Sequence, residues 1–400
     1  MSTTSPTFDV AATRAGFPSL TPGRIHLDNP GGTQVHRSVY DAVESYYRDS
    51  NANLGGPFVT SKASDRILDE ARSEAAAFLG AASGAEIVFG ANMTTLTMHA
   101  SRILCRSLGP GDEILVTGLD HDANVAPWML AASDRGVTIR QAGIDTESCL
   151  VDVDDFASKL SGRTRVAAFG WASNGAGTIN DVARLAALCR EAGALSYIDA
   201  VHYAPHGAID VSAIGCDFLV CSAYKFFGPH VGILYGRSEL LEQHRPYKVR
   251  PAPEEPPHSW ETGTINLEGI AGTAAAIGYL RGLGIDRVAA YERDLSSRLL
   301  EGLESIAGVT VYGTRDLDRR CPTYAFNVAG KHPAEVSAAL AERTIFVWDG
   351  NYYALELMQR LGIDEAGGAV RVGAVHYNTI AEIDAFLEGV ASLSSVSSGT

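Results

Sequence analysis

The sequence has few basic residues, no paired cysteines and no long apolar run. Its 32 lysines and arginines face 47 acidic residues, a formal net charge of −15, which argues against nucleic acid or an anionic membrane as the main partner. Residues 1–18 lack the apolar core of a signal peptide, and no run could span a bilayer. Six scattered cysteines without a Cys-x-x-Cys pair disfavour a disulfide scaffold or a structural zinc site. We expect a cytoplasmic protein that acts on a small molecule.

What is present indicates an α/β protein. With 400 residues, 46% of them hydrophobic, the chain can bury a large core and is long enough for two domains. Short segments that are apolar throughout alternate with amphipathic stretches, a pattern typical of a mainly parallel sheet covered by helices on both faces. The apolar segments are 87–89, 114–116, 166–169, 218–220 and 232–234.

Residues 243–260 interrupt this alternation with five prolines, which predicts an extended loop. Helical patterns follow, and strand–helix alternation resumes near residue 323. We therefore expect a large sheet domain at 30–265. A smaller α/β domain would be formed by 266–400 together with the N-terminal segment 1–29.

Two residues at the ends of apolar segments are candidates for chemistry. Of the five lysines, only Lys225 stands among apolar neighbours, so its pKa should fall and its amine should become nucleophilic; a lysine that snorkels from a strand end is the alternative. Asp199 ends another apolar segment, where a carboxylate needs a cationic or hydrogen-bonding partner, unless it is a simple cap. A nucleophilic lysine and an acid facing a pyridine nitrogen are what pyridoxal 5′-phosphate requires.

A phosphate site is predicted where the segment 87–90 is followed by Asn92, Met93 and Thr94. The start of a helix after a strand offers free N–H groups and a positive dipole end to an anion, although an ordinary N-cap explains the same residues. Ser222 and Lys225 also match the Ser-x-x-Lys pattern of penicillin-binding enzymes. That class also needs Ser-Asp-Asn and Lys-Thr-Gly, and neither tripeptide occurs in the sequence.

In their order along the chain, these motifs resemble the class V aminotransferase family, and within it the cysteine desulfurases of the sulfur-mobilising type. The likeness implies the pyridoxal-phosphate-dependent transferase fold of type I and a homodimer with shared active sites. It is carried by Asp120-His121, Ser173-Asn174, Asp199-Ala-Val-His202, Ser222-Ala-Tyr-Lys225, Gly228-Pro229, Glu261-Thr-Gly-Thr264, and Arg371 with Tyr377-Asn378.

The resemblance implies a role for each matching residue. Lys225 would bind the cofactor covalently and then act as general base and acid, Asp199 would keep the pyridine nitrogen protonated, and His121 would stack on the ring. Arg371 would bind the substrate carboxylate through a bidentate pair. The other cofactor-binding residues would be Asn174 and His202 at the ring hydroxyl, Asn92, Met93, Ser222 and Tyr224 at the phosphate, and Thr264 at the phosphate of the neighbouring subunit.

The sequence departs from the desulfurases at the thiol that carries the persulfide. The corresponding segment, 346–354, contains Tyr352 and Tyr353, and no cysteine follows Cys321. A phenol cannot hold a persulfide, so we expect Tyr353 to pack against the substrate or close the site. Small residues at Gly31 and Gly55, where the desulfurases have larger ones, predict a roomier substrate pocket.

These features favour a β-eliminating C–S lyase acting on cysteine or an S-substituted cysteine. Lys225 would remove the α-proton, and a sulfur leaving group at Cβ would then depart without help from a catalytic cysteine. Three other enzymes stay open: a cysteine desulfurase with an external thiol acceptor, an aminotransferase, and an amino-acid racemase or epimerase. The last needs a second acid, for which His121, Tyr353 and His376 are candidates. A non-enzymatic binding protein fits less well, because all the cofactor positions are filled.

Overall fold

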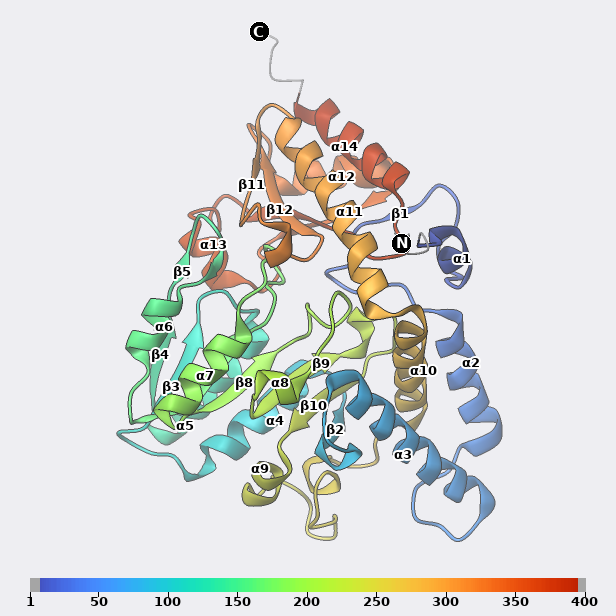
Figure 1. The fold of residues 1–400 in the computed structure, drawn as a ribbon, viewed down its shortest axis with the longest axis vertical. Helices are drawn as coiled ribbons and strands as arrows, with labels where there is room; N and C mark the ends of the chain where they lie inside the picture. Colours follow the sequence, from blue (N-terminus) through green and yellow to red (C-terminus); the bar gives the residue numbers. More distant parts are fainter. Residues whose placement is uncertain (1–7, 395–400) are drawn as a thin grey trace, which may run out of the picture.

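A seven-stranded sheet forms the centre of the larger part of the molecule (Figure 1). The computed structural model describes residues 8–394. The strand order is β2-β10-β9-β8-β7-β3-β4; β4, β3, β7, β8 and β9 pair in parallel, whereas β10 is antiparallel to both β9 and β2. The strands are β2 (Ile87–Gly90), β3 (Glu113–Thr117), β4 (Thr138–Ala142), β7 (Thr164–Gly170), β8 (Leu195–Asp199), β9 (Phe218–Ser222) and β10 (Gly232–Gly236). The mainly parallel sheet is confirmed, and all five predicted apolar segments lie in its strands.

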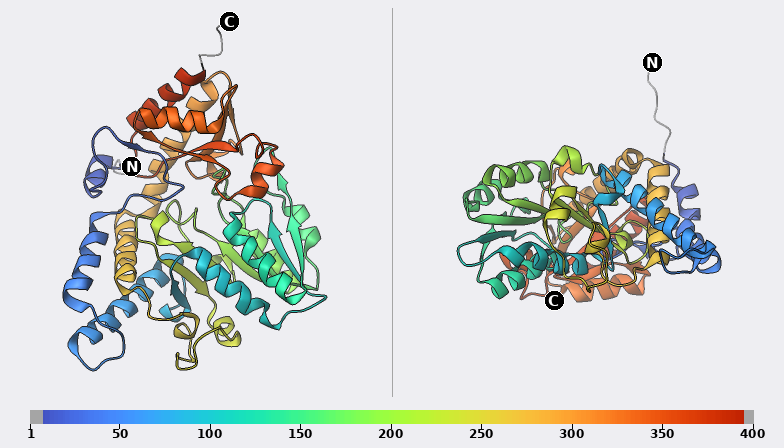
Figure 2. Two further views of the ribbon diagram at one scale, coloured as in Figure 1. Left: turned by 180° about the vertical axis from the view of Figure 1, so that it is seen from behind. Right: turned by 90° about the horizontal axis from the view of Figure 1, so that it is seen from below.

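Helices cover both faces of this sheet, as the two views of Figure 2 show. Alternate strand residues point to opposite faces: Leu219 belongs to one apolar cluster and Val220 to the other. Both clusters are apolar, which explains why the strands read as continuous hydrophobic segments. The first cluster includes residues of α3 (Val59–Leu79), α7 (Val182–Ala192) and α10 (Leu267–Leu283), and the second those of α4 (Met93–Leu104) and α5 (Ala126–Arg135).

A second, antiparallel sheet with the order β11-β12-β15-β14 lies at the other end of the molecule (Figure 1). Leu299, Phe326 and Phe386 belong to its core. The N-terminal segment joins it, because β1 (Ile25–His26) pairs in parallel with β13 (Ile345–Phe346). Its strands are β11 (Val309–Val311), β12 (Thr323–Val328), β14 (Trp348–Gly350) and β15 (Ala369–Gly373), and its helices are α11 (Ile285–Ser305), α12 (Pro333–Glu342) and α14 (Ile380–Ser394).

The domain boundary at residue 265 stays a prediction; α10, which lies beyond it, packs against α2 (Arg37–Ser45) and α3. Residues 244–257 contain no helix or strand, as expected for the proline-rich segment. Within residues 8–394, no helix is both long and apolar enough to cross a membrane. The remaining α-helices and strands are α1 (Val10–Ala15), α6 (Val153–Lys159), α8 (Val211–Ile214), α9 (Ser238–Gln243), α13 (Leu355–Arg360), β5 (Ile144–Asp145) and β6 (Leu150–Val151).

The carboxyl ends of the parallel strands meet at one edge of the large sheet, where α/β proteins bind ligands. Gly170, Asp199 and Ser222 end β7, β8 and β9 there. The first turn of α4 reaches the same edge because Gly232 leaves room for it: a Cβ at this position would lie 2.5 Å from the Asn92 carbonyl carbon. Strand ends and a helix N-terminus therefore converge on one place.

Candidate active site

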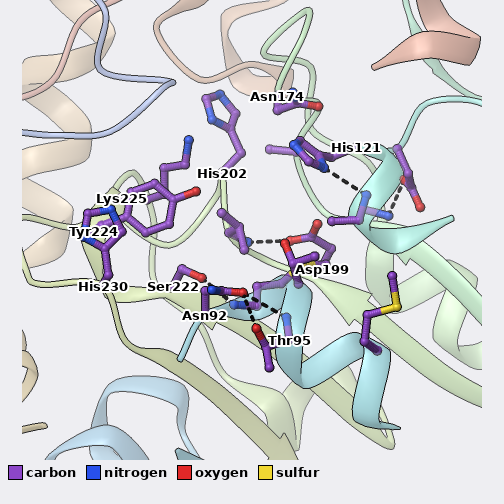
Figure 3. Close-up of a pocket in the computed structure, with 18 residues that line it drawn as sticks. Asn92, Thr95, His121, Asn174, Asp199, His202, Ser222, Tyr224, Lys225 and His230 are labelled. Atoms are coloured by element: carbon purple, nitrogen blue, oxygen red, sulfur yellow. Dashed lines mark hydrogen bonds between the residues drawn. The ribbon is translucent and has the colours of Figure 1, made fainter. Parts of the chain in front are cut away.

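A cavity of about 600 Å³ opens at this edge (Figure 3). It brings together ten of the residues predicted from the sequence. It is also lined by Asp120, Thr95, Met98 and His230, to which the sequence analysis gave no role. The predicted residues that line it are Asn92, Met93, Thr94, His121, Asn174, Asp199, His202, Ser222, Tyr224 and Lys225.

Lys225 lies at the end of a single helical turn (Ala223–Lys225) that follows β9. Its Nζ donates a hydrogen bond to the carbonyl oxygen of Pro30. Burial lowers the pKa of Lys225 to about 7; the positive charge of Arg371 adds to this shift and Asp199 opposes it. A substantial fraction of the amine is therefore neutral near pH 7, which is the form that attacks carbonyl groups.

Two carboxyl groups lie behind the cavity. Asp199 ends β8, is 8% exposed and accepts a hydrogen bond from the Val201 amide at 2.8 Å. Burial raises the pKa of Asp199 to about 6. Burial, followed by the charge of Asp199, raises the pKa of Asp120 to about 8, although Asp120 accepts hydrogen bonds from the Gly170 amide and the Thr117 hydroxyl. Within residues 8–394, no cationic side chain forms an ion pair with Asp199, although a buried carboxylate needs such a partner.

The start of α4 also lines the cavity (Figure 3). The Met93 amide donates to Ser222 Oγ at 2.8 Å, which joins the helix N-terminus to the end of β9. Asn92 caps the helix by accepting from the Thr95 amide at 2.9 Å. The ring of Tyr224 stacks on His230 with 5.0 Å between the ring centroids. Backbone amides, hydroxyls and a helix dipole at one point suit a phosphate group.

His121 lines the cavity and contacts Tyr353. Its Nδ1 accepts from the Ala123 amide at 3.0 Å. Burial, Lys225 and Arg371 lower the pKa of His121 to about 4, so the ring is neutral at pH 7. Tyr353 lies against it with ring centroids 5.3 Å apart, while its own side chain is 71% exposed.

Arg371, on β15 of the small sheet, does not itself line the cavity but contacts Asn174, which does. It is 5% exposed, and its guanidinium carbon lies 4.3 Å from the ring centroid of Tyr352. Its Nη1 donates to the Asn174 carbonyl at 2.8 Å, while the Asn174 side-chain amide donates to the Tyr352 carbonyl at 2.8 Å. Burial lowers the pKa of Arg371 to about 10, so it keeps its charge at neutral pH. Its Nε is buried without a partner among the described residues and can still donate to a carboxylate.

Several residues named in the sequence analysis lie outside this cavity. Thr264, predicted at the phosphate of a neighbouring subunit, lies beside a separate cavity of about 330 Å³, and its role stays a prediction. The room expected at Gly31 is not there, because a Cβ at this position would lie 2.5 Å from Nε1 of Trp348. Gly55 does not line the cavity either. His376, a candidate second acid, is buried elsewhere against Tyr279.

A lysine after one central strand, an acid at the end of the next, and a helix N-terminus at the same sheet edge define a pyridoxal-phosphate-dependent enzyme of fold type I. The model of the class V aminotransferases matches residues 25–386. The chain belongs to this family, and its cofactor is pyridoxal 5′-phosphate.

Named relatives are similar over nearly the whole chain. A probable cysteine desulfurase of Mycolicibacterium paratuberculosis is 34% identical and covers 96% of this chain, but the match spans only 58% of that relative. The chain spans less than two thirds of the length of both mycobacterial relatives that it matches. An aminotransferase-like protein of Gibberella zeae is 33% identical, with 95% of this chain and 97% of the relative covered. The apo structure of a cysteine desulfurase from Thermococcus onnurineus superposes with a TM-score of 0.91 at 30% identity, covering 96% of this chain and 97% of that one.

The residues present fit the cofactor. A protonated pyridine nitrogen would give Asp199 the cationic partner that it lacks, and the α4 N-terminus with Ser222 supplies donors for a phosphate. Asn174 Oδ1 is buried without a partner among the described residues and can accept from a ring hydroxyl. Lys225 offers the amine for covalent attachment, and His121 lies in the cavity as a flat, neutral ring.

Proposed function

We propose that this protein is a β-eliminating C–S lyase that acts on cysteine or an S-substituted cysteine. The reaction would convert the substrate and water into pyruvate, ammonia and a thiol. The observation that carries the proposal is a cofactor cavity without any thiol: all six cysteines of the sequence are buried, and none of them lines the cavity. A desulfurase that carries sulfur on its own cysteine needs such a thiol within reach of the substrate.

The side chains around the cavity support the elimination. Arg371 would bind the substrate carboxylate and thereby set which bond at Cα faces Lys225. The Lys225 amine, with its pKa near 7, suits removal of the α-proton and its later return to the leaving sulfur. When bound, pyridoxal phosphate supplies the electron sink that stabilises negative charge at Cα. Asp199 would maintain that capacity through its charge, and the neutral His121 would not compete for the proton.

Tyr352 and Tyr353 would stand where the desulfurases carry their thiol, and they would only orient Arg371 and contact the substrate. Tyr352 lies over Arg371 and Tyr353 over His121, so the two rings would border the bound substrate. The exposed ring of Tyr353 would contact whatever substituent the substrate sulfur carries, which makes Tyr353 a substrate-binding residue.

A cysteine desulfurase with an external thiol acceptor is the second candidate, and the names of the relatives favour it. Such an enzyme releases alanine instead of pyruvate. Epimerisation finds less support. His376 lies away from the cavity, and His121 holds no ionisable proton to donate at pH 7.

Product analysis separates these functions. The purified holoenzyme would be incubated with L-cysteine and with S-alkyl cysteines, with and without dithiothreitol, and pyruvate and alanine would be quantified by mass spectrometry. Elimination predicts pyruvate in a one-to-one ratio with released thiol, independent of dithiothreitol. Alanine that forms only in the presence of dithiothreitol would refute the lyase proposal and support the desulfurase. The Lys225→Ala variant should give neither pyruvate nor alanine.

A cytoplasmic homodimer with shared sites belongs to the same proposal. Thr264, Asn53 and Leu54 line the separate cavity, and Phe58 and Val59 nearby in the sequence are 55% and 78% exposed. In a dimer these residues would be covered, and Thr264 would complete the phosphate site of the partner. Light scattering tests the mass, and a Thr264→Ala variant should weaken cofactor binding without loss of the dimer.

A further inference from the structure

Three side chains with metal-binding atoms meet beneath the cofactor cavity. One ring nitrogen of His202, one of His206, and the sulfur of Cys321 all lie within 4.8 Å of one another. His202 and His206 lie on the turn that follows β8, whereas Cys321 comes just before β12 of the small sheet. Two imidazoles and a thiolate form a donor set that zinc and cobalt prefer over calcium or magnesium.

A buried carboxylate orients one of the two imidazoles. Glu292, on α11, is 2% exposed, and its Oε2 lies 2.6 Å from His206 Nδ1. The other oxygen, Oε1, accepts from the backbone amide of His376 at 2.9 Å. A histidine that binds a metal through one nitrogen commonly donates the proton on the other to such a carboxylate, which fixes its tautomer and ring orientation. Nε2 of His206 is thereby left as the lone-pair nitrogen.

Two polar atoms at this place are buried and have no partner among the described residues. They are Nε2 of His202 and the hydroxyl oxygen of Thr323. Both residues line a small cavity of about 10 Å³, together with His206 and Lys225. A space of this size accommodates about one water molecule or ion. His202 and Lys225 also line the large cavity, so an ion would enter through the active site.

We propose that His202, His206 and Cys321 form a binding site for a soft divalent transition-metal ion such as zinc. On binding, the metal forms bonds to two neutral imidazole nitrogens and to the Cys321 sulfur, while the thiol proton is released to solvent. The thiolate and the Glu292 carboxylate bring two negative charges, which balance the dication next to Lys225. Thr323 or a water molecule would take the fourth position of a tetrahedral site.

This site is compatible with the cofactor and does not depend on the reaction proposed above. A histidine has two ring nitrogens, so His202 can contact the cofactor with one and the metal with the other. The metal would also connect the turn after β8 to the small sheet through Cys321. The sequence disfavoured a structural zinc site because it contains no Cys-x-x-Cys pair, but here the ligands come from separate segments that only the fold brings together.

Metal titration of the holoenzyme tests the proposal. After dialysis against a chelator, the protein would be titrated with zinc and, separately, with cobalt(II), and bound metal would be measured by elemental analysis. We expect one ion per chain, with a cobalt spectrum in the red region typical of tetrahedral coordination and a thiolate charge-transfer band. X-ray absorption of the zinc form should show one sulfur and two imidazole nitrogens. Glu292→Gln should weaken zinc binding by roughly 10- to 100-fold.

Matched variants separate this site from adventitious binding. Cys321→Ser should remove the charge-transfer band and the sulfur signal, whereas Cys189→Ser, at a buried cysteine on α7 outside the cluster, should retain both. The proposal is overturned if the wild-type holoenzyme binds no stoichiometric metal, or if the zinc form shows no sulfur ligand. These readouts need no substrate, so they stand or fall separately from the product analysis.

Discussion

Replacing Tyr352 with leucine should weaken recognition of the substrate carboxylate and little else. The ring of Tyr352 lies over the guanidinium of Arg371 at 4.3 Å, and Arg371 is 5% exposed. A cation–π contact is worth about 0.5–1 kcal/mol in water and about 2 kcal/mol when desolvated, so we expect a loss of about 1–2 kcal/mol. Since about 1.4 kcal/mol corresponds to a tenfold change, the dissociation constant should rise by about 5- to 30-fold.

The assay compares two ligands in two proteins. Binding of an amino acid and of its amide, which lacks the carboxylate charge, would be followed through the visible absorption of the holoenzyme, in the wild type and in Tyr352→Leu. In Tyr352→Leu, the dissociation constant of the amino acid should rise by the full factor of about 5 to 30, and that of its amide should change little. Only the amino acid has the carboxylate that Arg371 binds. Tyr352→Phe keeps the ring and loses only the hydroxyl bond to the Ala369 carbonyl, so it should bind the acid nearly as the wild type does.

Backbone strain does not confound this comparison. Tyr352 has a positive φ of 54°, a conformation that is strained for tyrosine, leucine and phenylalanine alike because each carries a Cβ. An equal loss of affinity for acid and amide in Tyr352→Leu would refute the reasoning, since it would mean that the ring supports the cavity as a whole. Unchanged affinity for both would show that Arg371 is held by its bond to the Asn174 carbonyl alone.

Three further predictions concern the cofactor-free protein and the cofactor site. The pKa of Lys225 is about 10.5 in the unfolded chain and about 7 in the folded protein. Between these pH values the unfolded chain binds the extra proton, so the free energy of unfolding of the wild type should rise with pH relative to that of Lys225→Met. Urea titrations of both proteins measure this difference. Glu261 forms an ion pair at 2.7 Å with Arg72, whose side chain is 6% exposed. Glu261→Gln leaves Arg72 buried without a counter-charge and should lower the free energy of unfolding by about 3–5 kcal/mol. Gly232→Ala should cost about 1–3 kcal/mol, because the new Cβ would lie 2.5 Å from the Asn92 carbonyl carbon, and equilibrium dialysis should show weaker cofactor binding.

The last two substitutions have matched controls. Asp384→Asn breaks an ion pair whose side chains are more than 40% exposed and should cost less than about 1 kcal/mol. Gly278→Ala on α10 meets no atom within 4 Å and should not weaken cofactor binding. A flat pH profile for Lys225→Met, or equal losses in test and control variants, would contradict the corresponding argument.

The sheet and one wall of the site could be predicted because both follow from local patterns. Strands buried on both faces must be apolar throughout, so segments such as 218–220 are visible in the sequence. A polar residue at the end of such a segment lies at the sheet edge, which is why Asp199 and Lys225 were predicted and do line one cavity. The family resemblance added Ser222, His121 and Asn174.

The remaining contacts could not be predicted because they join segments far apart in the chain. Nothing near Lys225 indicates that its amine bonds to the carbonyl of Pro30. Similarly, the sequence around Asn174 or Tyr352 does not indicate that the Asn174 side chain donates a hydrogen bond to the Tyr352 carbonyl. The expectation of space at Gly31 was wrong for the same reason: the small residue accommodates Trp348 of β14, a neighbour that only the fold supplies.

The cofactor cavity and the predicted carboxylate-binding residue Arg371 belong to different sheets, and this division bears on how such an enzyme diversifies. The large sheet contributes Lys225 and Asp199, whereas Arg371 and the Tyr352–Tyr353 segment belong to the small sheet or its connections. Substitutions between β14 and α13 can therefore change which amino acid is bound, while the cofactor-binding residues Lys225 and Asp199 stay the same. During evolution, such enzymes could thus change their substrate many times through a few substitutions in this segment and retain the same reaction chemistry.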